Sequence, residues 1–266
     1  MKDIVKLYSA DKKSSVTIDK GELVSYLVND IEIMHQKEDA GWGSTEIEMF
    51  PIIGATKGNN FSVVTPRGDS KLDQHGILRT LDYSTEKTDS TTASFYKKYS
   101  ANTLVSNPKF PHKSSLKKLN WPYDFKFLKT FAITNEGLKI LFEITSEVNM
   151  PFMLGFHPAF KVYNHDFVIR TEDKSISLDN ILEVGAKAFL LEKCKDLTLE
   201  NNGNLGVRLR TSGYRHIMLW SEVKNMVCIE PITFYPPSVT TGDLHTGFDH
   251  SSGYEKFEVV ISPSVS

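Results

Sequence analysis

The feature that most constrains the fold is a two-residue alternation of apolar and polar side chains, which recurs in short runs along the chain. It is clearest in DFKFLKTFAIT (124–134) and LKILFEITSEV (138–148), which flank an Asn-Glu-Gly turn at 135–137. Successive side chains of a strand point to opposite faces, so a period of two predicts half-buried strands rather than helices. We therefore expect an antiparallel hairpin here.

The same alternation predicts strands along most of the chain. A second hairpin is expected from SSVTI (14–18) and LVSYLV (23–28), which flank a turn at 19–22, with a third strand at 31–36. Short helices are expected only at 115–119 and around Asp39. The pattern indicates an all-β chain folded as a large antiparallel sandwich. Further strands are expected at 61–65, 92–99, 207–211, 216–220, 226–230 and 256–262.

Composition narrows the functional class. The 266 residues fit a single domain spanning 1–266. With 31 basic and 33 acidic residues the net charge is -2, so neither nucleic acid nor an anionic membrane is an expected partner. The first residues lack an apolar signal region and no run approaches a membrane span, so a cytoplasmic location is expected. Cys194 and Cys228 have neither disulfide-framework nor zinc spacing and are expected to be reduced core thiols.

Three polar residues stand in contexts that an ordinary core strand would not use. His75 precedes Gly76 in a turn, His157 lies between aromatic residues before Pro158, and Glu230 ends an apolar run before a proline. The prolines are expected to stop both strands. Each residue also has a structural interpretation: a surface-loop histidine, a satisfied core histidine, and a strand-end glutamate in solvent. A buried carboxylate costs several kcal/mol unless it is paired, so Glu230 is the least ordinary of the three.

Motif spacing excludes several chemistries. The eight histidines include no HxH or HExxH pair, and the chain contains no GxSxG, GxGxxG or GxxxxGK[ST] motif. Metal, serine-nucleophile and nucleotide sites are therefore disfavoured. Acid/base chemistry without a cofactor remains.

Six motifs, in this order, resemble the aldose 1-epimerase family of the galactose mutarotase-like superfamily, in the branch of LacX-type proteins and hexose-6-phosphate mutarotases. One such pair of residues carries little information, but the order of the whole set makes the resemblance specific. The motifs are FPIIG (50–54), His75-Gly76 with Arg79, WPYDF (121–125), NMPFMLGFHPAF (149–160), LWS (219–221) and VCIEP (227–231).

The resemblance implies a β-supersandwich of two large antiparallel sheets with a sugar pocket and no cofactor. It implies that His157 is the general acid and Glu230 the general base of anomer interconversion. It also implies that His75 binds the sugar near its ring oxygen, and Arg79 is a candidate contact for sugar hydroxyls. Trp220 can stack on the sugar, whereas Phe160 is expected in the core.

The chain departs from the family pattern at three points. Ala55 follows FPIIG where many relatives have an arginine, a Tyr-Pro-Pro turn (235–237) follows CIEP, and Phe156 replaces a glycine beside the predicted acid. The substrate therefore stays open between a free aldose and a sugar phosphate, which two well-placed arginines would usually bind. A non-catalytic carbohydrate-binding protein is the third possibility. Catalysis would be favoured by a sugar-sized gap between His157 and Glu230, and binding alone by a wide separation.

Overall fold

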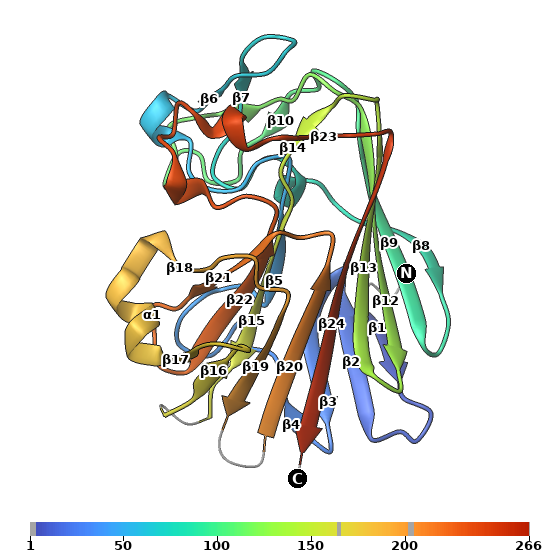
Figure 1. Ribbon diagram of the computed structural model, residues 1–266. Helices are drawn as coiled ribbons and strands as arrows, with labels where there is room; N and C mark the ends of the chain where they lie inside the picture. The colour runs from blue at the N-terminus through green and yellow to red at the C-terminus, as the bar shows by residue number, and fades with distance from the viewer. Residues whose placement is uncertain (1–3, 164–165, 202–204, 266) are drawn as a thin grey trace.

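A computed structural model describes residues 4–163, 166–201 and 205–265 and consists mainly of antiparallel strands (Figure 1). The larger sheet has nine strands. In spatial order they are β17 (Ser175–Ser177), β16 (Val168–Arg170), β19 (Asp196–Asn201), β20 (Leu205–Ser212), β24 (Tyr254–Val265), β13 (Gly137–Ser146), β12 (Phe125–Thr134), β9 (Thr92–Tyr99) and β8 (Ser84–Thr88).

A second large sheet has five antiparallel strands and carries most of the candidate residues. Its spatial order is β18 (Phe189–Leu191), β21 (His216–Trp220), β22 (Met226–Ile232), β15 (Gly155–Lys161) and β5 (Glu46–Met49). The N-terminal strands form a four-stranded sheet in chain order: β1 (Ile4–Tyr8), β2 (Ser14–Asp19), β3 (Glu22–Val28) and β4 (Ile31–Glu32). The prediction of large antiparallel sheets is confirmed.

Short elements fill the connections. Figure 1 shows β6, β7 and β10 gathered at one end of the molecule. Two-stranded pairs are β6 (Ser62–Val63) with β7 (Ser70–Lys71), β10 (Val105–Ser106) with β11 (Lys118–Leu119), and β14 (Pro151–Phe152) with β23 (Asp249–His250). The helical segments are α1 (Leu178–Val184), η1 (Lys57–Asn59), η2 (Leu78–Thr80), η3 (Gly185–Lys187), η4 (Pro236–Ser238) and η5 (Leu244–Gly247). None of the helices in the described ranges is long and apolar enough to cross a membrane.

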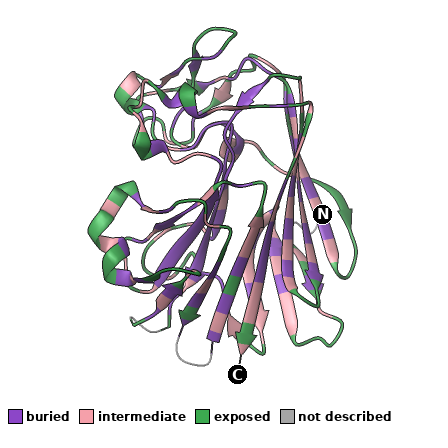
Figure 2. Cartoon of the chain, viewed as in Figure 1, coloured by how far each residue is buried: buried purple, intermediate pink, exposed green. Residues whose placement is uncertain are grey.

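The predicted hairpin at 124–148 is confirmed as β12 and β13, paired from Phe125 opposite Ser146 to Thr134 opposite Gly137. Burial alternates along both strands, whereas β15 and β22 of the five-stranded sheet are buried almost throughout (Figure 2). The rings of Phe127 and Phe142 lie 5.9 Å apart on the buried face, and Phe142 lies 5.0 Å from Phe156 of β15. This aromatic stack joins the two large sheets.

Some local predictions were wrong. Residues 115–119 form no helix but contribute β11, and turns surround Asp39. The strand expected at 31–36 is limited to β4 and one bridge at Met34. Helix α1 was missed: its capping box, with Ser177 bonded to Asn180 at both ends, is short-range chemistry inside a segment without helical periodicity. Cys194 and Cys228 are free thiols, and Cys194 is only half-buried.

Candidate active site

Strand register brings His157 and Glu230 together. Gly155 of β15 lies opposite Ile232 of β22, and Ala159 lies opposite Cys228, so the intervening register sets His157 across from Glu230. Paired residues of antiparallel strands direct their side chains to the same face. The two side chains, 73 positions apart in sequence, therefore meet on one face of the five-stranded sheet.

The prediction that proline ends each of these strands was wrong. Strand β15 continues through Pro158 to Lys161, and β22 continues through Pro231 to Ile232. The amide of Ala159 donates to Thr45 on the β5 side, so the nitrogen of Pro158 faces β22, where the ladder is open between Gly155 and Ala159. A proline is tolerated where its missing N–H has no partner to lose.

Pro231 obeys the same rule. Ile232 accepts from Arg215 on the β21 side, and Thr233 donates to Leu154 on the β15 side, so the nitrogen of Pro231 also faces the open stretch. His157-Pro158 on β15 and Glu230-Pro231 on β22 therefore lie opposite each other, where the hydrogen bonds between the two strands are interrupted. His157 and Glu230 stand at that interruption.

The turn that carries His75 is fixed against the segment following β5. His75 has φ 66°, an unfavourable backbone conformation for a residue other than glycine. Its N–H donates to the carbonyl of Gly54, and its ring Nδ1 accepts from the N–H of Gly54 at 3.3 Å. Because Nδ1 is an acceptor, the neutral ring carries its proton on Nε2, which makes Nε2 a donor.

The acid/base candidates are in direct contact. His157 Nε2 lies 3.3 Å from Glu230 Oε1, and the two side chains are almost fully buried. The two groups are therefore neither on opposite sides of a sugar-sized gap, the arrangement named above as favouring catalysis, nor widely separated, as binding alone would favour. The ring of His75 is 6.0 Å from that of His157, and the ring of Trp220 is 5.9 Å from it. Of the predicted site residues, His75, His157 and Trp220 therefore lie close together with Glu230.

Burial controls the charge of this pair. It lowers the pKa of His157 to about 3, with a smaller contribution from the positive charge of Arg79, and raises the pKa of Glu230 to about 8. Removing a group from water disfavours its charged form. In the ligand-free protein near pH 7 the pair therefore holds one proton, on Glu230, next to a neutral imidazole.

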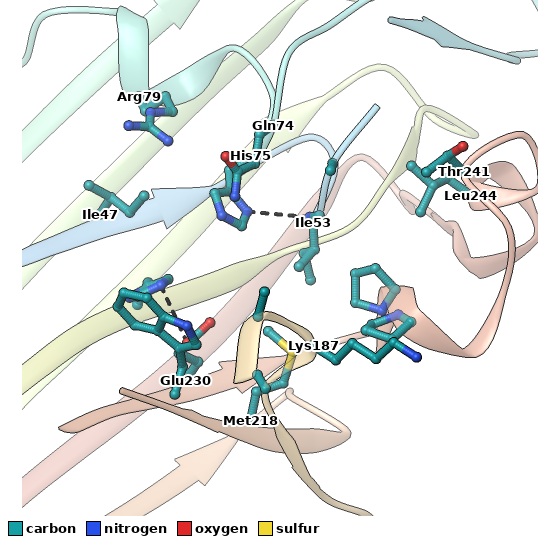
Figure 3. Close-up of a pocket in the computed structure, with 18 of the residues that line it drawn as sticks. Ile47, Ile53, Gln74, His75, Arg79, Lys187, Met218, Glu230, Thr241 and Leu244 are labelled. Atoms are coloured by element: carbon teal, nitrogen blue, oxygen red, sulfur yellow. Dashed lines mark hydrogen bonds and ion pairs between the residues drawn. The ribbon is translucent and has the colours of Figure 1, made fainter. Parts of the chain in front are cut away.

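A cavity of about 840 Å³ opens over this pair, which falls within the range of small-molecule sites. In Figure 3, Glu230 and Met218 lie on one side of the cavity, His75 and Arg79 lie across from them, and Thr241 and Leu244 lie farther along. All five predicted site residues line it: His75, Arg79, His157, Trp220 and Glu230.

The six arginines differ in whether they line the cavity. Arg79 lines the cavity, and each of the other five is bonded to a carboxylate elsewhere. The pairs are Arg67–Glu147, Arg170–Glu200, Arg208–Asp196, Arg210–Glu136 and Arg215–Asp249. Arg67 therefore does not replace the arginine that is absent at Ala55, although Ala55 itself lines the cavity.

Two of the sequence departures have different consequences. Phe156 is not beside the acid in space, because it alternates with His157 and points into the core against Phe142. Pro236 and Pro237 of the Tyr-Pro-Pro turn form part of the cavity wall. Phe160 is fully buried, as predicted.

Sequence reasoning missed several residues of the cavity. The indole of Trp42 lies 4.4 Å from the ring of His157, tilted by 35°, and covers one face of it. Trp42 sits in a loop between two glycines, where no periodicity points inward. Lys109, Lys113 and Lys187 also line the cavity, from loops whose lysines resemble any solvated lysine in sequence. Among the residues that the structure describes, no three His, Cys, Asp or Glu side chains are grouped as metal ligands.

Comparison with known proteins identifies the fold and the family. Solved structures with similar folds include a galactose mutarotase-like protein from Lactobacillus casei ATCC 334, with a TM-score of 0.78 and 18% identity over 98% of this chain and 99% of that one. They also include a galactose mutarotase related enzyme from Lactobacillus acidophilus, with a TM-score of 0.77 and 20% identity over 99% and 98%. An aldose epimerase homologue from C. elegans has a TM-score of 0.65 and 12% identity over 98% of each chain.

At these identities the structural likeness establishes the fold alone. No curated protein matches the sequence. The family model described as aldose 1-epimerase matches residues 21–226, which is most of the chain. The assignment to a LacX-type or hexose-6-phosphate branch stays a prediction. The chain belongs to the aldose 1-epimerase family.

Proposed function

We propose that this protein is an aldose 1-epimerase that interconverts the α and β anomers of a hexose or related aldose. The observation that carries the proposal is the contact of 3.3 Å between His157 Nε2 and Glu230 Oε1 on the wall of the cavity. Both groups are buried and share a single proton near neutral pH. Perturbed titratable pairs in a cavity of this size are typical of acid/base sites.

The reaction needs one group that takes a proton and one that gives a proton. The base removes the proton of the anomeric hydroxyl while the acid protonates the ring oxygen. The C1–ring oxygen bond then breaks with its electron pair on the ring oxygen, and C1 becomes an aldehyde. Rotation about C1–C2 and the reverse transfers close the ring on the other face. Both oxygens are bonded to C1, so an acid and a base on the same wall of the cavity can reach them together.

The family roles make His157 the acid and Glu230 the base. In the free protein the shared proton lies on Glu230, so these roles require it to move to His157 when the sugar binds. His75 Nε2–H donates to the sugar near its ring oxygen, Arg79 to other hydroxyls, and Trp220 offers an apolar face. No cofactor is required.

The test is a screen of anomer exchange by NMR saturation transfer or polarimetry, over free and 6-phosphorylated aldoses. We expect exchange above the spontaneous rate for at least one sugar, and no acceleration by the Glu230→Gln variant at equal concentration. Acceleration of none of the sugars would overturn the proposal. Sugar binding without acceleration would instead support a carbohydrate-binding protein on the same fold.

A second candidate, a hexose-6-phosphate 1-epimerase, is favoured by the charges along the cavity. Arg79, Lys109 and Lys113 line it together. Burial lowers the pKa of Lys109 and the like charge of Arg79 lowers it further, while Asp73 opposes both effects. Asp73 lies 3.8 Å from Lys109 Nζ and also accepts from Asn107. Arg79 and Lys109 are thus partly buried cations that lie near each other, with the carboxylate of Asp73 beside them. Such a group of cations favours an anionic ligand.

This candidate predicts a preference that can be measured. The double variant Lys109→Met, Lys113→Met should raise KM for a 6-phosphorylated aldose at least about tenfold and leave the free aldose nearly unchanged. Lys117→Met, Lys118→Met removes two exposed lysines at the start of β11, a few residues after Lys113, and serves as the matched control. Equal effects on both sugars would contradict the phosphate assignment.

A further inference from the structure

Four ionisable side chains that the proposed reaction does not use are buried between the sheets. Glu46, Glu48, Lys97 and Lys129 are each at most 5% exposed. Lys129 Nζ lies 2.6 Å from Glu46 Oε1 and also contacts Glu48 Oε1, while Lys97 Nζ lies 3.8 Å from Glu48 Oε2. We call these four residues the buried ion cluster.

The buried ion cluster joins the two large sheets. Lys97 and Lys129 come from β9 and β12 of the nine-stranded sheet, and both glutamates come from β5, at the edge of the five-stranded sheet. Glu46 Oε1 also accepts from the N–H of Leu23 at 2.9 Å, which adds the N-terminal sheet. Strand β5 is thus attached from behind at two alternate residues.

Strand β5 lies between the two segments that carry the pocket histidines. On one side, Ile47 is paired with His157 of β15. On the other side, Phe50, directly after β5, donates its N–H to the carbonyl of His75 and accepts from Ile77 and Leu78. The position of β5 therefore fixes the backbone of both His157 and His75.

The cluster reaches the pocket at a second point. Lys97 Nζ donates to the carbonyl of Leu78 at 3.0 Å, and Leu78 immediately precedes Arg79 in η2. A smaller hollow of about 290 Å³ is bordered by all four cluster residues and shares Ile47 and Arg79 with the candidate active site. Because these two side chains border both spaces, the cluster lies directly behind the pocket wall.

Stability alone does not account for such a cluster. Desolvation of buried ions often exceeds their attraction, and well-packed apolar replacements are commonly neutral or stabilising. We propose that the buried ion cluster is a positioning device for the active site: Lys129 holds β5, and through it His157, while Lys97 holds η2 and with it Arg79. This inference rests on the proposed function for its kinetic consequences, and its structural consequences are measurable without activity.

The first variant neutralises the attachment of β5 while keeping side-chain size: Glu46→Gln, Glu48→Gln, Lys129→Met. The variant leaves Lys97 without its carboxylate partner Glu48, so its melting temperature is measured near pH 9, where Lys97, whose pKa burial lowers to about 8, is largely neutral. There we expect the melting temperature to equal or exceed that of the wild type at the same pH. We expect kcat to fall at least about tenfold, since small displacements of a reacting group cost up to about a hundredfold. The ring resonances of His157, assigned by their loss in His157→Gln, should shift in ¹H–¹⁵N spectra.

The second variant, Lys97→Met, removes the bond to Leu78 O but leaves Lys129 with both glutamates. It should raise KM about threefold or more, with kcat within about twofold, because Arg79 is proposed to bind rather than react. The control is Lys139→Met, Glu258→Gln, an ion pair with Nζ–Oε2 2.6 Å on the outer face of the same nine-stranded sheet. It should leave kcat, KM and the His157 resonances unchanged.

Three outcomes would overturn the positioning role. The triple variant could keep wild-type kcat and His157 resonances, both variants could change kcat and KM in the same ratio, or activity could fall only in proportion to the unfolded fraction. If the wild type accelerates no aldose, the proposed function fails instead. In that case, a comparison of the His157 ring resonances between the triple variant and the control still decides whether the cluster positions the ring.

Discussion

At the scale of single residues, the site depends on one proton shared by two buried groups. Glu230 and His157 are each an uncommon choice for the interior, and burial drives both toward neutrality. A pair that holds one proton can act in either direction, which suits a reaction whose forward and reverse halves exchange roles. The number of protons that the pair holds therefore matters more for the reaction than which of the two pKa values is the higher.

Glu230→Gln separates catalysis from folding. The amide has nearly the same shape but cannot exchange the proton, so we expect the rate of anomer exchange to fall at least about a hundredfold, with a much smaller change in KM. Glu222→Gln, in the exposed loop between β21 and β22, is the control. Unchanged exchange in the Glu230 variant would remove Glu230 from the mechanism. Exchange lost together with the fold would make it structural.

The same substitution has a stability effect with a defined sign. The folded pKa of Glu230 is raised from 4.5 to about 8, so its neutral form is the stable one in the fold. Its contribution is complete below about pH 4.5 and is lost as pH rises to about 8. Because glutamine does not ionise, the variant should gain on the wild type across this window, by a few kcal/mol at pH 8. Urea unfolding at pH 5 and pH 8 measures the difference.

The pH profile follows from the same two groups. The one-proton pair persists between the pKa of His157, about 3, and that of Glu230, about 8. We expect kcat/KM to be nearly flat from about pH 5 to 7 and to fall above about pH 8, as the free protein loses the shared proton. Spontaneous exchange, measured in each buffer, must be subtracted. A falling limb near pH 6.5, typical of a solvated histidine, or a rate that climbs through pH 9 would contradict this account.

At the scale of elements, the site is made by interruptions of regular structure. The open ladder between β15 and β22 and the turn at His75 each place one pocket histidine. Gly76 makes that turn possible: its φ is +77°, and a Cβ there would lie 2.3 Å from the carbonyl oxygen of Phe50. The carbonyl belongs to the hydrogen-bonded backbone after β5, which cannot move freely.

Gly76→Ala should therefore damage both stability and the site. Strain at positive φ and the backbone clash together should cost on the order of 2 kcal/mol or more, and displacement of His75 should raise KM. Gly68→Ala is the matched control, because Gly68 also has positive φ, +99°, but a Cβ there meets no atom within 4 Å. Equal effects of the two substitutions on KM would show that strain alone, rather than displacement of His75, is responsible.

Sequence predicts elements whose pattern is local and fails where partners are distant. The β12–β13 hairpin was predictable because its period and turn are contiguous. In strand β5 the charged residues, Glu46 and Glu48, face the core instead of solvent. Their partner Lys129 lies more than 80 residues away in the sequence, and it shares the buried face of β12 with Phe127 and Phe131. Periodicity assigns such charged residues to solvent. Only the three-dimensional pairing reveals the cluster.

The candidate site was predictable to a similar extent. Motif order supplied His157 and Glu230, and both line the cavity. Their direct contact, the open ladder behind it and the cover from Trp42 depend on register between strands far apart in the sequence. The lysines along the cavity were not predictable, because a loop lysine carries no sequence signal that separates a binding position from a solvated one.

At the scale of the whole molecule, two kinds of contact join the large sheets beside the site. The buried ion cluster attaches the edge strand β5, and the stack of Phe127, Phe142 and Phe156 fills the adjacent core. The aromatic contacts bury apolar area, which stabilises the fold. The ionic contacts have narrow geometry and little net stability. We therefore expect stability and positioning to be separable by mutation.

Phe142→Ala tests that division from the apolar side. Its ring is fully buried and contacts Phe127 and Phe156, so truncation should leave a cavity and cost about 3–5 kcal/mol in the free energy of unfolding. Leu141→Ala, one residue away on the outer, half-exposed face of β13, should cost far less. Urea unfolding of both variants measures the costs. Among folded molecules, kcat of Phe142→Ala should stay within about threefold of wild type, because the ionic attachment of β5 persists. A larger fall in kcat than in the triple variant of the buried ion cluster would assign positioning to the aromatic stack instead.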